Sequence, residues 1–157
     1  MCKEKKEFMH EAVNQSLLSV KNGGGPFGAV IVKNGEIIAK AANSVTQTND
    51  PTAHAEVNAI RLASSKLNSF DLSGCEIYTS CEPCPMCLGA IYWARIDKIY
   101  YGNTKNDAKN IGFDDSFIYD EMELPLENRK VKFVQLEHKK AQKAFKIWQL
   151  KEDKTGY

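Results

Sequence analysis

A cluster of cysteines in the middle of the chain constrains the fold more than any other feature. Three of the five cysteines, Cys81, Cys84 and Cys87, lie within seven residues of one another. The first residues (MCKEKKEF) do not resemble an export signal, and an odd number of cysteines in such a chain favours a metal or catalytic role over disulfides. The pattern P-C-P-M-C at 83–87 suits two thiolates that bind one ion at a helix start. The fold must therefore begin a helix near Cys84.

A second motif, His54-Ala55-Glu56, precedes Cys84 by thirty residues, which leaves room for a helix, a loop and a strand. Catalytic zinc takes three protein ligands of imidazole or thiolate type and keeps its fourth position for water. A carboxylate two residues after the histidine can lie beside that water and move its protons. The combination of H-x-E with P-C-x-x-C is the signature of zinc deaminases. We predict one Zn²⁺ per subunit, bound by His54, Cys84 and Cys87, with Glu56 as the proton shuttle.

The alternative from another class is a non-catalytic binding module that a structural zinc stabilises. Such a site needs a fourth protein ligand. Cys81 is the nearest candidate, but it precedes a turn and is expected to end a strand. His10 and His138 are expected on helix surfaces. We interpret Cys2, Cys75 and Cys81 as packing or bystander residues, so the catalytic interpretation is favoured.

The remaining sequence predicts one domain, 1–157, in which helices and strands alternate. Asn34-Gly35 is a two-residue hairpin signal between two short apolar runs. The apolar periodicity predicts helices at about 4–20, 53–66, 84–93 and 138–150, and strands at 29–32, 37–41, 75–79, 97–101 and 131–136. This order favours an α/β fold, a three-layer α/β/α sandwich around a central five-stranded mixed sheet.

Charge and hydropathy exclude some classes of partner. The chain has 21 Lys and Arg against 20 Asp and Glu, a formal net charge of +1. Phosphate contacts supply much of the affinity of nucleic-acid-binding proteins, so a stable nucleic-acid partner is not expected. No apolar run approaches the ~20 residues that cross a bilayer, so no membrane association is expected. We expect a cytoplasmic protein.

Four stretches resemble the cytidine and deoxycytidylate deaminase superfamily. They are GGPFGAVIV (24–32), NDPTAHAEV (49–57), YTSCEPCPMCLGAIYWAR (78–95) and GFDDSFIY (112–119). Within that superfamily the chain is most similar to the short bacterial guanine deaminases. The first three stretches are shared in looser form with bacterial tRNA adenosine deaminases, and the last favours guanine. The resemblance runs from the first helix to about residue 119.

The resemblance implies roles for residues around the zinc site. Asn43 would hydrogen-bond a purine, Phe27 would stack on its face, and Trp93 would line the pocket. Asp115 would reach the amino edge of the substrate, with Asp114 as the alternative if the register shifts. The residues alone leave other interpretations open, since Asn43 can be a turn former, and Phe27 and Trp93 can be core side chains.

The resemblance also implies a homodimer in which the C-terminal part, about 120–157, is exchanged between subunits. Asp115 and Tyr157 would then complete the active site of the neighbour, and Tyr157 would close over the bound base. The alternative for Tyr157 is a frayed chain end. Residues 120–156 depart most from the family pattern.

The expected reaction is the hydrolysis of guanine to xanthine and ammonia, with a small purine base as the substrate. A tRNA adenosine deaminase is the first alternative, and it needs a basic surface that the charge balance does not indicate. A cytosine deaminase is a further alternative.

Overall fold

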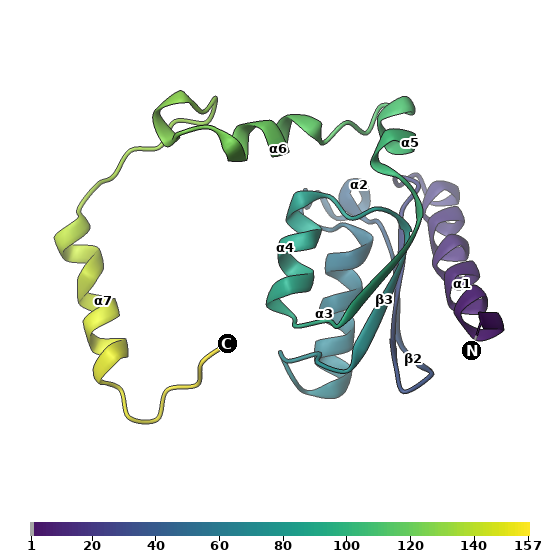
Figure 1. The fold of residues 1–157 in the computed structure, drawn as a ribbon, viewed down its shortest axis with the longest axis horizontal. Coiled ribbons are helices and arrows are strands. Elements are labelled where there is room, and N and C mark those ends of the chain that lie inside the picture. The colour runs from purple at the N-terminus through teal and green to yellow at the C-terminus, as the bar shows by residue number, and fades with distance from the viewer. Residues whose placement is uncertain (1) are drawn as a thin grey trace. The chain divides into compact units, whose positions relative to one another are not determined.

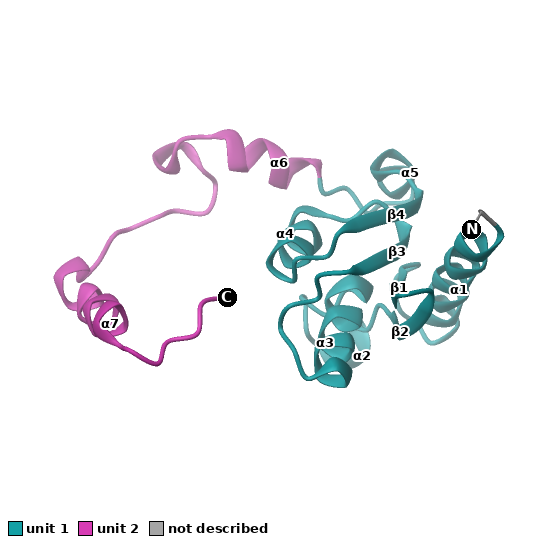
Figure 2. Ribbon diagram, turned by 60° about the horizontal axis from the view of Figure 1, so that its bottom comes forward, with its two compact units in different colours: residues 1–115 teal, residues 116–157 magenta. Residues whose placement is uncertain are grey.

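The computed structural model describes residues 2–157 and divides the chain into two compact units. The first unit ends at Asp115 and the second is Ser116–Tyr157 (Figure 2). Met1 and the side chain of Cys2 lie outside the described part, so the predicted bystander role of Cys2 does too.

A mixed sheet forms the centre of the first unit. Its strands are β1 (Gly28–Lys33), β2 (Glu36–Ala42), β3 (Cys75–Cys81) and β4 (Lys98–Asn103), in the order β2-β1-β3-β4. Strand β1 is antiparallel to both β2 and β3, whereas β3 and β4 are parallel. Asn34 and Gly35 have φ values of 52° and 79° at the β1–β2 turn. Two positive φ values in a two-residue loop are what the predicted hairpin requires.

Helices cover both faces of this sheet and confirm the three-layer prediction. Helix α1 (Cys2–Lys21) packs on one face, and α3 (Ala55–Leu67) and α4 (Pro85–Trp93) lie on the other (Figure 1). Strand β1 is buried on both sides, because Val30 and Val32 pack towards α1 while Ile31 belongs to the opposite cluster. Two short helices, α2 (Val45–Thr48) and α5 (Lys105–Asn110), complete the unit.

The contact between α1 and β1 depends on a glycine. A Cβ atom at Gly28 would lie 2.3 Å from the carbonyl oxygen of Ala12 and 2.4 Å from the amide nitrogen of Ser16. No real side chain tolerates such distances to backbone atoms. The glycine therefore lets the first helix approach the sheet, where the Gly28 amide also donates to Ser80 Oγ at 3.0 Å.

The second unit contains α6 (Ser116–Glu123), the short 3-10 helix η1 (Leu126–Asn128) and α7 (His138–Leu150). The predicted fifth strand at 131–136 is wrong, and the described residues form a sheet of four strands. A strand needs a neighbouring edge for its amides and carbonyls, and residues 116–157 contain no strand to supply one. Val131, Phe133, Val134 and Leu136 are instead exposed.

No helix of the described residues has both the length and the apolar character needed to cross a membrane.

Candidate metal centre

The predicted ligands lie at the starts of two helices. His54 is the N-cap of α3 and Cys84 the N-cap of α4, both with extended backbone, and Cys87 follows in the first turns of α4. Pro85 opens α4, where its missing amide hydrogen costs no helical bond. Helices α3 and α4 pack on the same side of the sheet (Figure 1). Their starts therefore bring the three side chains together. The positive ends of both helix dipoles favour thiolate at this place.

The distances between the ligand atoms fit a tetrahedral zinc ion. His54 Nδ1 lies 3.6 Å from Cys84 Sγ and 3.5 Å from Cys87 Sγ, and all three atoms are within 4.8 Å of one another. Zn–N and Zn–S bonds at the tetrahedral angle require a nitrogen–sulfur separation of about 3.6 Å. The predicted ligand set is therefore preorganised for zinc.

The fourth position has no protein ligand among the described residues. The group of His, Cys, Asp and Glu side chains that could bind a metal contains His54, Cys84 and Cys87. Cys81 does not join it, because its thiol donates to the Thr104 carbonyl at 3.6 Å. Three ligands describe a catalytic site with an open position, and a structural zinc site needs four.

The ligands share their protons unequally before metal enters. A hydrogen bond from Cys87 and one from His54 lower the pKa of Cys84 to about 4. The bond with Cys84 raises the pKa of His54, and Cys87 keeps its proton because its bond with Cys84 and its burial raise its pKa. Binding of zinc must then release any thiol proton that remains in this coupled pair, since only thiolate binds the metal.

Glu56, the predicted proton shuttle, lies beside the predicted metal ligands. It is the second residue of α3, and its side chain is only 6% exposed. The Cys87 thiol donates to Glu56 Oε2 at 3.4 Å, so the carboxyl group is adjacent to a ligand. Burial raises the pKa of Glu56, which brings this carboxylic acid closer to the range in which it can both accept and donate a proton.

Asn43 and Phe27 lie next to each other at the ends of β2 and β1. Asn43 is buried, and its amide donates to the Phe27 carbonyl at 3.0 Å. Asn43 Oδ1 also accepts from the Val45 amide at 3.3 Å, so it helps to form the turn as well. The half-buried Phe27 ring packs edge-on against Phe113, with centroids 4.9 Å apart.

Asp115, the last residue of the first unit, lies within electrostatic reach of the ligands of its own chain. Partial burial raises its pKa, and the negative charge of Cys84 raises it further. Asp114 instead forms an ion pair with Lys109 at 3.1 Å.

The other two predicted residues are exposed within the chain. Trp93 ends α4 with 68% of its surface exposed, so the alternative that it is a core residue is wrong. Tyr157 belongs to the second unit and is 74% exposed.

Sequence reasoning missed residues that hold this site in place through the backbone. Glu82 precedes the Pro83-Cys84 step, and its amide donates to the Asn103 carbonyl at 2.8 Å. Its Oε2 accepts from the Lys105 amide at 3.0 Å, which joins the ligand loop to the start of α5. Phe113, on the segment after α5, contacts Phe27. No spacing pattern reveals these contacts, because Glu82 bonds to backbone groups that residues of many types supply, and the Phe113 ring meets Phe27 from a segment far away in the sequence.

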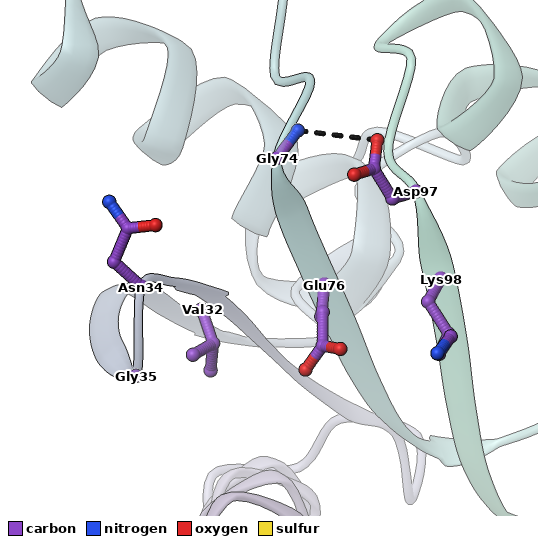
Figure 3. A pocket seen from close by; sticks show the side chains of 7 residues that line it. All are labelled: Val32, Asn34, Gly35, Gly74, Glu76, Asp97 and Lys98. Carbon is purple, nitrogen blue, oxygen red and sulfur yellow. Dashed lines mark hydrogen bonds between the residues drawn. The ribbon is translucent and has the colours of Figure 1, made fainter.

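A hollow of about 340 Å³ lies at the opposite end of β3 from the ligands (Figure 3). Its lining residues are Val32, Asn34, Gly35, Gly74, Glu76, Asp97 and Lys98, and none of them is a predicted site residue.

Comparison with known families agrees with the geometry. Residues 2–103 match the model of the cytidine and deoxycytidylate deaminase zinc-binding region, a match that includes every predicted ligand and Glu56. The chain belongs to this deaminase family. The deaminase is therefore a zinc-dependent hydrolytic enzyme, and the alternative of a non-catalytic zinc module is wrong.

Relatives resemble the deaminase over most of its length. Guanine deaminase of Bacillus subtilis is 51% identical over 96% of this chain and 97% of its own. A crystal structure of guanine deaminase from that organism superposes with a TM-score of 0.93 at 50% identity, covering 97% of this chain and 98% of that chain. The tRNA-specific adenosine deaminase of Aquifex aeolicus is 43% identical over 82% of this chain and 83% of its own. Another similar crystal structure contains 2,6-diaminopurine, with a TM-score of 0.67 and 35% identity, covering 69% of this chain and 61% of that chain.

Proposed function

We propose that the deaminase hydrolyses guanine to xanthine and ammonia. The ligand triad with Glu56 beside it determines the reaction type. The choice of guanine is supported by the similarity to a guanine deaminase along nearly the whole chain, which extends past the family motifs into residues after 103.

Glu56 carries the proton transfers in this mechanism. When bound, Zn²⁺ lowers the pKa of a water molecule towards ~7 and so provides a nucleophile at neutral pH. Glu56 takes a proton from the attacking water and delivers it to the ring nitrogen beside the amino-bearing carbon. The remaining hydroxide bonds to that carbon, and Glu56 then takes the proton of the added hydroxyl and passes it to the amino group. The carbon–nitrogen bond breaks as the carbonyl forms, and ammonia leaves, assisted by Asp115. The burial that raises the pKa of Glu56 suits a group that must accept and donate within one cycle.

The neighbouring side chains would bind the base. Phe27 stacks on the purine face, a contact worth ~1–3 kcal/mol per base in nucleic-acid complexes. Asn43 hydrogen-bonds the ring edge, Asp115 approaches the amino group and Trp93 lines the pocket. The burial of Asn43 and its bond to Phe27 support this arrangement, because they hold both residues in one place.

We further propose that the deaminase works in the cytoplasm as a homodimer that exchanges its C-terminal part, about 120–157. Tyr157 and Asp115 of one subunit would then complete the site of the other, as the family resemblance implied. The exchange is supported by the second unit, in which no residue of Ser116–Tyr157 is buried. Asp115 lies within electrostatic reach of Cys84 of its own chain, which instead favours a role in the site of its own subunit.

The direct test is a steady-state assay of ammonia release by the zinc-loaded protein. Guanine should be turned over faster than adenine, cytosine or their nucleosides, and the protein stripped by a chelator should be inactive until zinc is restored. If the zinc-loaded protein releases no ammonia from guanine, the substrate assignment is wrong.

The similarity to a tRNA-specific adenosine deaminase makes that activity the second candidate. It predicts retention of the protein by immobilised tRNA, with a marked loss between low and moderate salt. A net charge of +1 gives no reason to expect such retention. Strong, salt-dependent retention together with deamination of tRNA adenosine would favour it over guanine.

A further inference from the structure

Asn58 occupies a junction near the metal centre that no motif indicates. It lies one turn into α3, and its amide donates to the carbonyl of the N-cap His54 at 2.9 Å. Its side-chain Nδ2 lies within hydrogen-bond distance of three acceptors, the Ala42 carbonyl (3.0 Å), Ser44 Oγ (3.0 Å) and the Ala53 carbonyl (3.3 Å). The side chain thus joins the end of β2 to the start of α3.

The three acceptors belong to chain neighbours of Asn43 and His54. Ala42 and Ser44 are the chain neighbours of Asn43, and Ala53 directly precedes His54. The Ser44 amide also donates to the Ala53 carbonyl at 3.0 Å, so backbone and side chain bridge the same two segments. One amide group therefore links the residue proposed to bind the base with the helix start that carries a metal ligand and Glu56.

We propose that Asn58 is a positioning residue that sets the place of Asn43 relative to the metal ligands and so determines the affinity for the base. This inference rests on the proposed function, in which Asn43 hydrogen-bonds the substrate. Asn58 itself contacts neither the ligand atoms nor Glu56 through any described hydrogen bond.

Asn43 lies where β2 ends and a loop begins, so the bonds of Asn58 add to those that already hold it. Asn43 follows the last residue of β2, where a single backbone bond to the Phe27 carbonyl continues the ladder, and the next helix, α2, has only four residues. Segments with few buried contacts open locally at low free energy. The Asn58 bonds on both sides of Asn43 oppose such opening at the residue where base binding needs a fixed amide.

Two substitutions test the proposal, Asn58→Ala and Asn58→Asp. The first removes the side chain, and the second keeps its shape while replacing the Nδ2 donor by an oxygen that faces carbonyl oxygens. Loss of a hydrogen bond of ordinary net strength predicts a KM for guanine raised by about 3- to 10-fold, with kcat and zinc content unchanged. Asn14→Ala, at an exposed amide on α1, is the matched control and should leave KM unchanged.

A double-mutant cycle separates positioning from a general structural role. In an Asn43→Ala background, Asn58→Ala should have little further effect on KM, because its effect passes through Asn43. If the two effects multiply, or if Asn58→Ala lowers kcat while KM stays at the wild-type value, the proposal is wrong.

Amide hydrogen exchange gives a measurement that does not depend on activity. Asn58→Ala and Asn58→Asp should speed exchange at the Asn43 and Ser44 amides, while the amides of β1 and β3 stay protected. Unchanged exchange at Asn43 and Ser44 would overturn the inference. A wild-type protein that releases no ammonia from guanine would instead refute the proposed function, and the exchange result would still decide whether Asn58 fixes Asn43.

Discussion

Glu56 has a position that serves chemistry at the expense of stability. A carboxyl group that is 6% exposed and bonded to a thiol loses hydration that an exposed glutamate keeps. Burial penalises its charged form and raises its pKa. A proton can therefore reside on Glu56 during part of the reaction, as deamination requires.

Glu56→Gln should keep the zinc and lose the reaction. Glutamine fills the same space but cannot take a proton from water, so kcat should fall by at least ~100-fold, the usual size of a general acid–base contribution. Metal analysis of the purified variant should still find one zinc per subunit, because His54, Cys84 and Cys87 are unchanged.

The matched control is Glu36→Gln, which removes the same charge from an exposed position at the start of β2. It should leave kcat at the wild-type value. A fully active Glu56→Gln protein would contradict the assigned role of this carboxylate.

At the residue scale the sequence predicts the metal ligands better than it predicts the residues that hold the neighbouring segments in place. His54, Cys84, Cys87 and Glu56 have side chains whose chemistry and spacing are specific to zinc hydrolysis, so the sequence reveals them. Asn58 acts on backbone carbonyls and a hydroxyl that a wide range of sequences could supply. Only the folded chain shows that the Asn58 side chain bridges them.

Among the elements, α1 and β1 approach each other closely at Gly28, and the cost of adding a side chain there can be measured. Gly28→Ala would place a Cβ within 2.4 Å of the helix backbone, and helix or strand must move to admit it. Overpacking of this kind costs about 1–3 kcal/mol. Urea denaturation should therefore show a lower free energy of unfolding for Gly28→Ala.

Gly89→Ala is the control for this change. Gly89 lies inside α4, where a Cβ would meet nothing within 4 Å, and alanine favours a helix by about 1 kcal/mol over glycine. This variant should be as stable as the wild type or more so. Equal destabilisation by both substitutions would show that the close approach at Gly28 is not the cause.

The elements also show that a turn signal predicted structure correctly, whereas an apolar run did not. Asn34-Gly35 predicted the β1–β2 hairpin correctly, because the turn itself demands residues that accept positive φ. The run at 131–136 is apolar enough to suggest a strand, but strand formation depends on a neighbouring edge. The fold decides whether a neighbouring strand offers its edge, so the pattern of six residues cannot predict it.

At the scale of the whole molecule the two units differ in character. The first has buried clusters on both faces of its sheet, whereas no residue of Ser116–Tyr157 is buried. Exposed large apolar side chains in this second unit include Phe117, Phe133, Phe145, Ile147 and Leu150. Exposed apolar side chains in such number are typical of an interaction surface, which supports the proposed exchange between subunits.

Complementation between two damaged subunits tests the exchange. A Glu56→Gln subunit keeps Tyr157 but lacks the proton shuttle, and a Tyr157→Ala subunit keeps Glu56 but lacks the proposed closing side chain. If Tyr157 acts on the neighbour, a co-expressed mixed dimer contains one complete site, so its activity should exceed that of either parent.

Each parent dimer, prepared alone, is the control for this experiment. A mixture whose activity is only the average of the two parents would place Tyr157 in its own subunit or outside the site.

His54 and Cys84 are helix N-caps and Cys87 lies in the first turn of α4, and neither buried apolar cluster includes any of the three. The sheet can therefore complete its core before any zinc arrives. We therefore expect zinc deprivation to leave a pool of folded, inactive protein. The catalytic capacity of such a pool would then follow the zinc supply within the time of metal binding, with no new protein synthesis.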